Sequence, residues 1–202
     1  YIADSTSVKL KLSSKGVLDA KMSSSRLAFN GNYIKNLRAD FSNREDNLTG
    51  DIDADVIRLG EIAALEKSRL KMYADDNRIG VGFMYDNDGQ LDNSGEIYAI
   101  GDLERETPDG GLALALRLLP SSVKLNSRHW NIRESQLRLF GDGMQVKTFE
   151  IEGDEQRLSL YGNLSKSHAD TLSLELDRFD IGIVNPLITP DLGLRGKATG
   201  LA

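Results

Sequence analysis

A leucine stands at every second position in Gly110-Gly111-Leu112-Ala113-Leu114-Ala115-Leu116-Arg117-Leu118-Leu119-Pro120. Successive side chains of a β-strand point to opposite faces of the sheet, so this spacing gathers the four alternating leucines on one face. Glycines before the run and proline after it are typical of turns. The segment therefore predicts a β-strand with one apolar face.

The same alternation of apolar and polar residues recurs along the chain. It predicts further strands around residues 8–12, 52–56, 70–72, 137–139, 158–160 and 172–176. Short separators rich in Asn, Asp and Gly lie between them and suit hairpin turns, whereas helical crossovers would need longer connections. We predict an all-β fold: an elongated, curved, mostly antiparallel sheet with an apolar concave face.

Two segments could form helices instead of strands, and in two of the predicted strands the alternation of apolar and polar residues is interrupted. Residues 60–67 predict about two helical turns, and residues 180–185, stopped by Pro186, predict a turn or short helix. Both are expected to be short connectors. Around residues 56–59 and 146–151 the apolar positions move out of alternation, which predicts a β-bulge or a bend.

Composition limits the classes of function. The chain has 202 residues with 31 acidic and 25 basic side chains, so a basic nucleic-acid-binding surface is not expected. It contains no cysteine, which excludes disulfides and thiolate metal sites. No segment approaches the roughly 18 apolar residues of a membrane helix, and no signal peptide is recognised. We interpret residues 1–202 as a single elongated segment of a longer repetitive protein, with a possible internal boundary near residues 105–110.

Several residues could suggest metal sites. His129 and His168 are far apart in sequence and have no ligand spacing around them. Asp51, Asp53 and Asp55 would line one strand face, and residues 86–90 resemble the opening of a calcium loop. Surface histidines, a solvated strand face and a hairpin turn explain these residues more simply. We expect no metal site.

Catalytic and cofactor motifs are not recognised either. Gly80-Val81-Gly82 lacks the downstream glycine and helix of a dinucleotide site, and there is no P-loop or Ser-His-Asp pattern. We therefore expect no catalytic residue, no cofactor and no enzymatic activity.

The apolar faces are the strongest candidate for a binding site. They could form the core of a closed sandwich or a groove for acyl chains. Aromatic residues make up only 6% of the chain, whereas a closed core of this size usually contains more large rings. Leucine-rich surface suits flexible lipid tails. The groove candidates are Leu112, Leu114, Leu116, Leu118, Leu137, Leu139, Leu158, Leu160, Leu172, Leu174 and Leu176.

The last third of the chain carries a family resemblance. Residues 120–125 lead to His129-Trp130-Asn131-Ile132, and Tyr161-Gly162-Asn163-Leu164 and Leu194-Arg195-Gly196 follow with alternating strands between them. This pattern resembles the TamB-like proteins of the AsmA-like family, the translocation and assembly module proteins. The resemblance covers residues 120–202, and the rest of the chain is similar in style.

The resemblance implies a rolled β-sheet with an apolar groove, sometimes called a β-taco. It implies a periplasmic protein anchored in the inner membrane. That protein would move phospholipid toward the outer membrane, or support assembly there with an Omp85-type barrel partner. The family has no catalytic residues to transfer.

Two alternative functions remain open from the residues alone. The first is a closed β-sandwich or a repetitive cell-surface module for binding or adhesion. The second is an enzyme on a β-helix scaffold, such as a polysaccharide lyase. That enzyme would need clustered charges along one groove, and the 19 glycines show no tight coil repeat.

Overall fold

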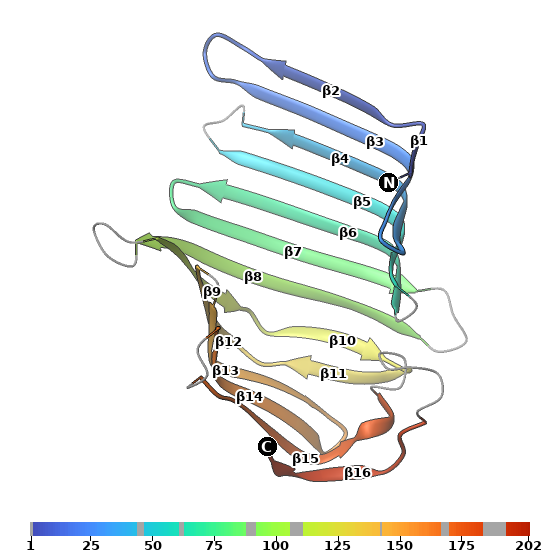
Figure 1. Ribbon diagram of the computed structural model, residues 1–202, viewed down its shortest axis with the longest axis vertical. Helices are drawn as coiled ribbons and strands as arrows, with labels where there is room; N and C mark the ends of the chain where they lie inside the picture. The colour runs from blue at the N-terminus through green and yellow to red at the C-terminus, as the bar shows by residue number, and fades with distance from the viewer. Residues whose placement is uncertain are drawn as a thin grey trace.

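A computed structural model describes residues 2–43, 47–60, 63–87, 92–105, 111–141, 143–166, 170–183 and 193–202. Its strands form one sixteen-stranded sheet in which every pairing is antiparallel (Figure 1). The all-β prediction of an elongated, curved antiparallel sheet is confirmed. The strands are β1 (Ile2–Asp4), β2 (Ser7–Leu12), β3 (Leu18–Phe29), β4 (Asn32–Ser42), β5 (Leu48–Leu59), β6 (Ala63–Asp75), β7 (Arg78–Asn87), β8 (Asn93–Arg105), β9 (Leu112–Leu118), β10 (Ser121–Leu125), β11 (Arg128–Ile132), β12 (Ser135–Phe140), β13 (Gly143–Gly153), β14 (Gln156–Leu164), β15 (Leu172–Asp180) and β16 (Lys197–Leu201).

The topology is a meander in which three long strands are each broken into two. β1 and β2 both pair with β3 and are separated at Ser5, which has a φ of 47°. β9 and β10 both pair with β8 on either side of Pro120, which has no N–H to donate to the ladder. β11 and β12 both pair with β13. β9 also continues the sheet directly from β8, across the boundary considered near residues 105–110, of which 106–110 lie outside the described residues.

The prediction of a helical connector at residues 60–67 is wrong. Residues 63–67 belong to β6, and residues 63–66 pair with residues 56–59 of β5; residues 61–62 lie outside the described part of the chain. Hydrogen bonding and packing within the sheet override the local helix propensity of this segment. The second connector is present as a single 3₁₀ turn at residues 181–183, where the Gly182 amide donates to Asp180 Oδ1 at 2.9 Å.

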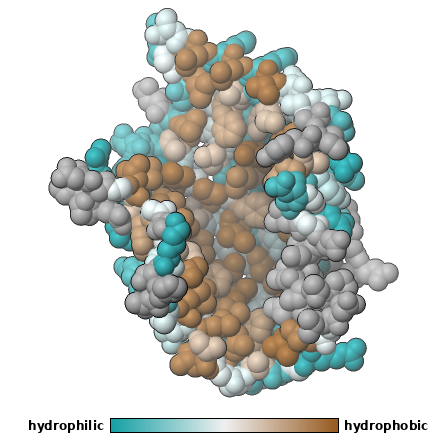
Figure 2. All heavy atoms as spheres, in the orientation of Figure 1, coloured by the Kyte–Doolittle hydropathy of each residue, from teal (hydrophilic) through white to brown (hydrophobic). Residues whose placement is uncertain are grey.

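The sheet has an apolar face and a polar face. Side chains of directly opposite residues in neighbouring strands point to the same side, so the register connects Val8 to Met22, Met22 to Ala39 and Ala39 to Ile52. From Ile52 the apolar face continues through Leu70 and Phe83 to Ile97. Figure 2 shows apolar side chains in a hollowed band along the long axis, between polar flanks.

Charged side chains pair across strands on the polar face. Lys21 Nζ lies 2.5 Å from Asp40 Oδ2, and Arg78 Nε lies 2.9 Å from Asp102 Oδ1. Exposed ion pairs such as these contribute about 0–1 kcal/mol each, so their main effect is to favour this register.

A bend crosses β3, β4, β5 and β6 along one line. On it, the buried apolar-face positions include Ser24, Ala54 and Ser68, all with small side chains. Beyond the line the alternation shifts by one residue in each strand, and Asn36 and Lys67 adopt positive φ angles of 50° and 45°. Small side chains leave room for the sheet to turn sharply toward this face, and Figure 1 shows the strand ends turning there. The bend expected near residues 56–59 is therefore the β5 part of a bend that crosses four neighbouring strands.

A cluster of buried apolar side chains lies in the C-terminal half of the chain. Trp130 and Phe179 lie with ring centroids 5.6 Å apart, and Val123 and Ile132 complete the buried cluster. We call these four residues the Trp130 cluster. Partly buried apolar side chains surround it: Ile97, Leu118, Leu125, Phe149, Ile151, Leu158, Leu176 and Ile183.

Candidate functional site

The eleven leucines proposed from the sequence share one face of the sheet. Leu116 lies opposite Leu137, and Leu114 lies opposite both Leu103 and Leu139. The face continues through β13 to β14 and β15, where Leu158 and Leu160 lie opposite Leu176 and Leu174. Leu172 lies opposite Gly162, which itself lies opposite Val146. Residues distant in sequence therefore form one continuous leucine surface.

None of the eleven leucines is fully buried. Leu112 is 64% exposed, and the others are half-buried or, like Leu139, more exposed. Leu118, Leu158 and Leu176 pack against the Trp130 cluster and help to close the C-terminal half. The remaining leucines are thus better placed to line an open surface. The described strands form one sheet, so the alternative of two sheets packed face to face is not the arrangement found.

The sequence interpretation missed the N-terminal part of this surface. Met22, Ile52, Leu70 and Phe83 extend the apolar face across β3, β5, β6 and β7. The signal was present as alternation around residues 8–12, 52–56 and 70–72, but those residues were assigned only to strands. We call the complete surface the apolar trough: the apolar-face side chains from β2 to β15, bordered by the bend across β3–β6.

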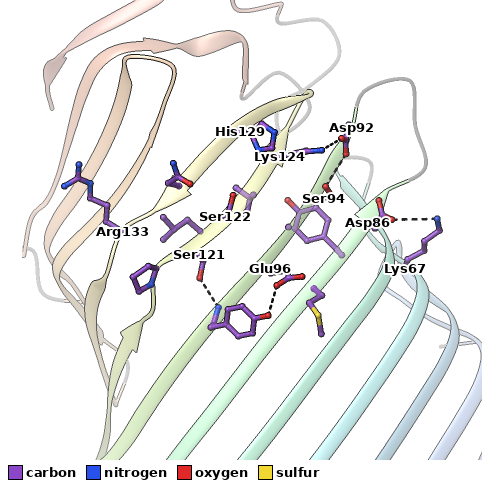
Figure 3. Close-up of a pocket in the computed structure, with 18 of the residues that line it drawn as sticks. Lys67, Asp86, Asp92, Ser94, Glu96, Ser121, Ser122, Lys124, His129 and Arg133 are labelled. Atoms are coloured by element: carbon purple, nitrogen blue, oxygen red, sulfur yellow. Dashed lines mark hydrogen bonds and ion pairs between the residues drawn. The ribbon is translucent and has the colours of Figure 1, made fainter.

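The polar face carries a separate cleft of about 1190 Å³ where β8 meets β10 and β11 (Figure 3). Lys124 Nζ donates to Asp92 Oδ2 at 2.7 Å, and this bond holds the pKa of Asp92 below its ordinary value. Arg133 lies 2.7 Å from Glu152 and 2.9 Å from Glu150, and its pKa is raised, mainly by the hydrogen bond to Glu152. The cations of this cleft are thus held by neighbouring carboxylates, which favours a structural role.

Tyr98 provides a test of the electrostatics in this cleft. Its hydroxyl donates to Glu96 Oε2 at 2.7 Å, and this bond, followed by desolvation, raises the pKa of Tyr98. A raised folded-state pKa stabilises the fold at pH values below the unfolded pKa, and this stabilisation is lost as pH rises through the folded pKa. We expect Glu96→Gln to lower the pKa of Tyr98 in an absorbance titration at 295 nm. Tyr98→Phe identifies its signal by difference, and an unchanged Tyr98 midpoint in Glu96→Gln would contradict the assigned cause.

The carboxylates considered for metal binding have protein partners. Asp53 Oδ1 lies 2.5 Å from Arg69 Nε, Asp51 lies 4.0 Å from Lys71 Nζ, and Asp55 accepts a hydrogen bond from Asn36 at 2.7 Å. Within the described ranges, no group of three His, Asp or Glu side chains could hold a metal ion. His129 is exposed in the polar cleft. His168 and residues 88–90 lie outside the described residues.

Gly82 has a structural role in β7, because it lies directly opposite Tyr98 and a β-carbon there would lie 3.2 Å from the Tyr98 ring. Gly80 lies opposite Tyr73, and a β-carbon there would meet no side chain within 4 Å. A large ring over a glycine restores the contact area that a strand loses where it has no side chain.

Comparison with known proteins adds no assignment: no family model, no curated protein and no solved structure matches this chain. In the described part of the chain, no helix combines the length and apolarity needed to cross a membrane. The candidate site therefore depends on the geometry of the apolar trough.

Proposed function

We propose that the apolar trough holds the acyl chains of phospholipids and that this chain is a non-enzymatic lipid-conduit segment. One observation carries the proposal. The apolar face continues in register from β2 to β15, and outside the Trp130 cluster no second layer covers it among the described residues. A soluble domain rarely leaves a contiguous apolar surface larger than a few hundred Å² without a ligand or partner.

The chemistry of the trough favours flexible hydrocarbon over a rigid ligand. Its walls are mainly leucine, isoleucine, valine and methionine, whose branched or flexible side chains adapt to chains in many conformations. Burial of apolar surface contributes about 25 cal/mol per Å², so a long acyl chain gains affinity along its whole length. Few polar groups interrupt the surface, so the trough would favour the lipid tail without selecting a particular one.

The resemblance of residues 120–202 to TamB-like proteins supports the cellular role that we propose. In this proposal, the chain is part of an inner-membrane-anchored protein in the periplasm of a Gram-negative-type cell envelope. It supports transport of phospholipid to the outer membrane, or assembly of proteins there with an Omp85-type barrel protein. The groove of that family and the apolar trough share the same kind of surface, which is why we prefer this role to an adhesion module.

Site-specific photocrosslinking tests whether lipid occupies the trough. A photoreactive residue at position 114, which faces Leu103 and Leu139, is expected to capture phospholipid in cells or from vesicles. The matched control is position 115, the next residue of the same strand, which lies on the polar face opposite Asp102 and Arg138. Equal capture at both positions, or none at position 114, would contradict lipid binding in the trough.

A further inference from the structure

We propose that the open edge of β2 adds a β-strand from a polypeptide in which apolar and acidic residues alternate. β2 pairs with β3 only, so its other edge presents backbone donors and acceptors without a strand partner among the described residues. Such an edge is a template for strand addition, in which main-chain hydrogen bonds give affinity and alternate side chains give specificity. This inference does not depend on lipid binding.

The apolar face of β2 is the most exposed part of the trough. Val8, Leu10 and Leu12 are 67%, 66% and 71% exposed, although each lies opposite a residue of β3 on the same face. An added strand with apolar residues at alternate positions would cover the uncovered side of these three side chains. The edge therefore favours an apolar residue at every second position of the incoming strand.

The polar face of β2 determines which charge is favoured at the polar positions of the incoming strand. Lys9 lies opposite Lys21, a like-charged pair, and Lys21 is already paired with Asp40 at 2.5 Å. Lys11 lies opposite Asp19, which accepts a hydrogen bond from Ser42. Neither Lys9 nor Lys11 forms an ion pair within 4.0 Å in the described part of the chain. Acidic side chains on an added strand would lie next to both lysines.

The sheet itself contains an acidic strand paired with a basic strand in this way. In β5, Ile52 and Ala54 alternate with Asp51 and Asp53, and these two carboxylates lie directly opposite Lys71 and Arg69 of β6. β6 thus presents to β5 the same alternation of apolar and basic residues that β2 presents at its open edge. At the opposite edge of the sheet, β16 carries Ala198 and Gly200 at the positions opposite the apolar residues of β15, so it offers less apolar surface.

Disulfide trapping tests the proposal, because the chain has no cysteine of its own. A peptide copying residues 49–56, with cysteine in place of Ile52, is incubated with the Leu10→Cys protein in a redox buffer. The control peptide copies residues 68–74, with cysteine in place of Leu70, and has basic residues at the alternating positions. The control protein is Leu112→Cys, because Leu112 is 64% exposed on the apolar face but lies away from the β2 edge.

We expect the acidic peptide to be trapped at position 10 about tenfold more than the basic peptide, and more than at position 112. Lys9→Glu combined with Lys11→Glu is expected to reverse this preference, and circular dichroism checks that the variant retains its strand content. Equal trapping of both peptides, or equal trapping at positions 10 and 112, would overturn the proposal. Leu10→Cys dimers that exclude the peptide would instead show that the edge pairs with a second copy of the chain.

Discussion

Replacing Trp130 by alanine is expected to lower the free energy of unfolding by about 3–5 kcal/mol, enough to unfold much of the C-terminal half. Trp130 is only 1% exposed and packs against Phe179 and Val123. Its loss would leave a cavity where the curled sheet cannot easily collapse, because backbone pairing fixes the strands on each side. Equilibrium unfolding in urea, followed by far-UV circular dichroism, measures the change.

Two further variants make this result specific. Trp130→Phe is expected to cost less, because a ring remains against Phe179 and the indole N–H, which has no acceptor among the described residues, is removed. Leu112→Ala truncates an exposed side chain of the same face and is expected to change stability by less than about 0.5 kcal/mol. Similar losses for Trp130→Ala and Leu112→Ala would show that the Trp130 cluster is not the main core.

Replacing Leu114 by aspartate is expected to reduce phospholipid capture about tenfold or more while the fold is retained. A carboxylate in the trough would need to stay hydrated, so it excludes hydrocarbon from that position. Leu114 is only half-buried, so water reaches the new charge in the lipid-free protein. Capture is measured by crosslinking from a photoreactive residue at position 116, and stability is measured by thermal unfolding.

Matched variants separate the effect of charge from that of side-chain size. Leu114→Ala keeps the trough apolar and is expected to retain most of the capture. Gln136→Asp adds the same charge to the polar face, opposite Arg117, and is expected to leave capture unchanged. Loss of the folded state in Leu114→Asp, together with no lipid capture by the unmodified protein, would eliminate the conduit at this strand.

The strands and their faces were largely predictable from the sequence, because a period of two depends only on backbone geometry. Alternation correctly gathered Leu112 to Leu118 on one face. It could not identify which strand lies beside which, so the pairing of Leu116 with Leu137 required the structure. Local propensity failed at residues 63–67, where pairing of residues 63–66 with β5 decides the conformation.

Features that several strands form together could not be predicted from the sequence. The bend needs small or irregular positions at matching points of four strands, and Ser24, Ala54 and Ser68 are unremarkable individually. The polar cleft combines residues of β6, β7, β8, β10 and β11 and of the segments next to them, without any shared spacing. The buried position of Trp130 depends on how tightly the distant Phe179 strand curls over it.

The meander also has a consequence for folding kinetics. Each long strand pairs with the strands that precede and follow it in the chain, and the connections are short except between β15 and β16, which residues 181–196 separate. The loop-closure entropy of each new hairpin is small, so the sheet can grow from any folded hairpin by successive addition. Its stability then accumulates along one dimension, as in repeat proteins. The strands farthest from the Trp130 cluster, β1 to β4, would exchange their amide hydrogens first, and the cluster itself last.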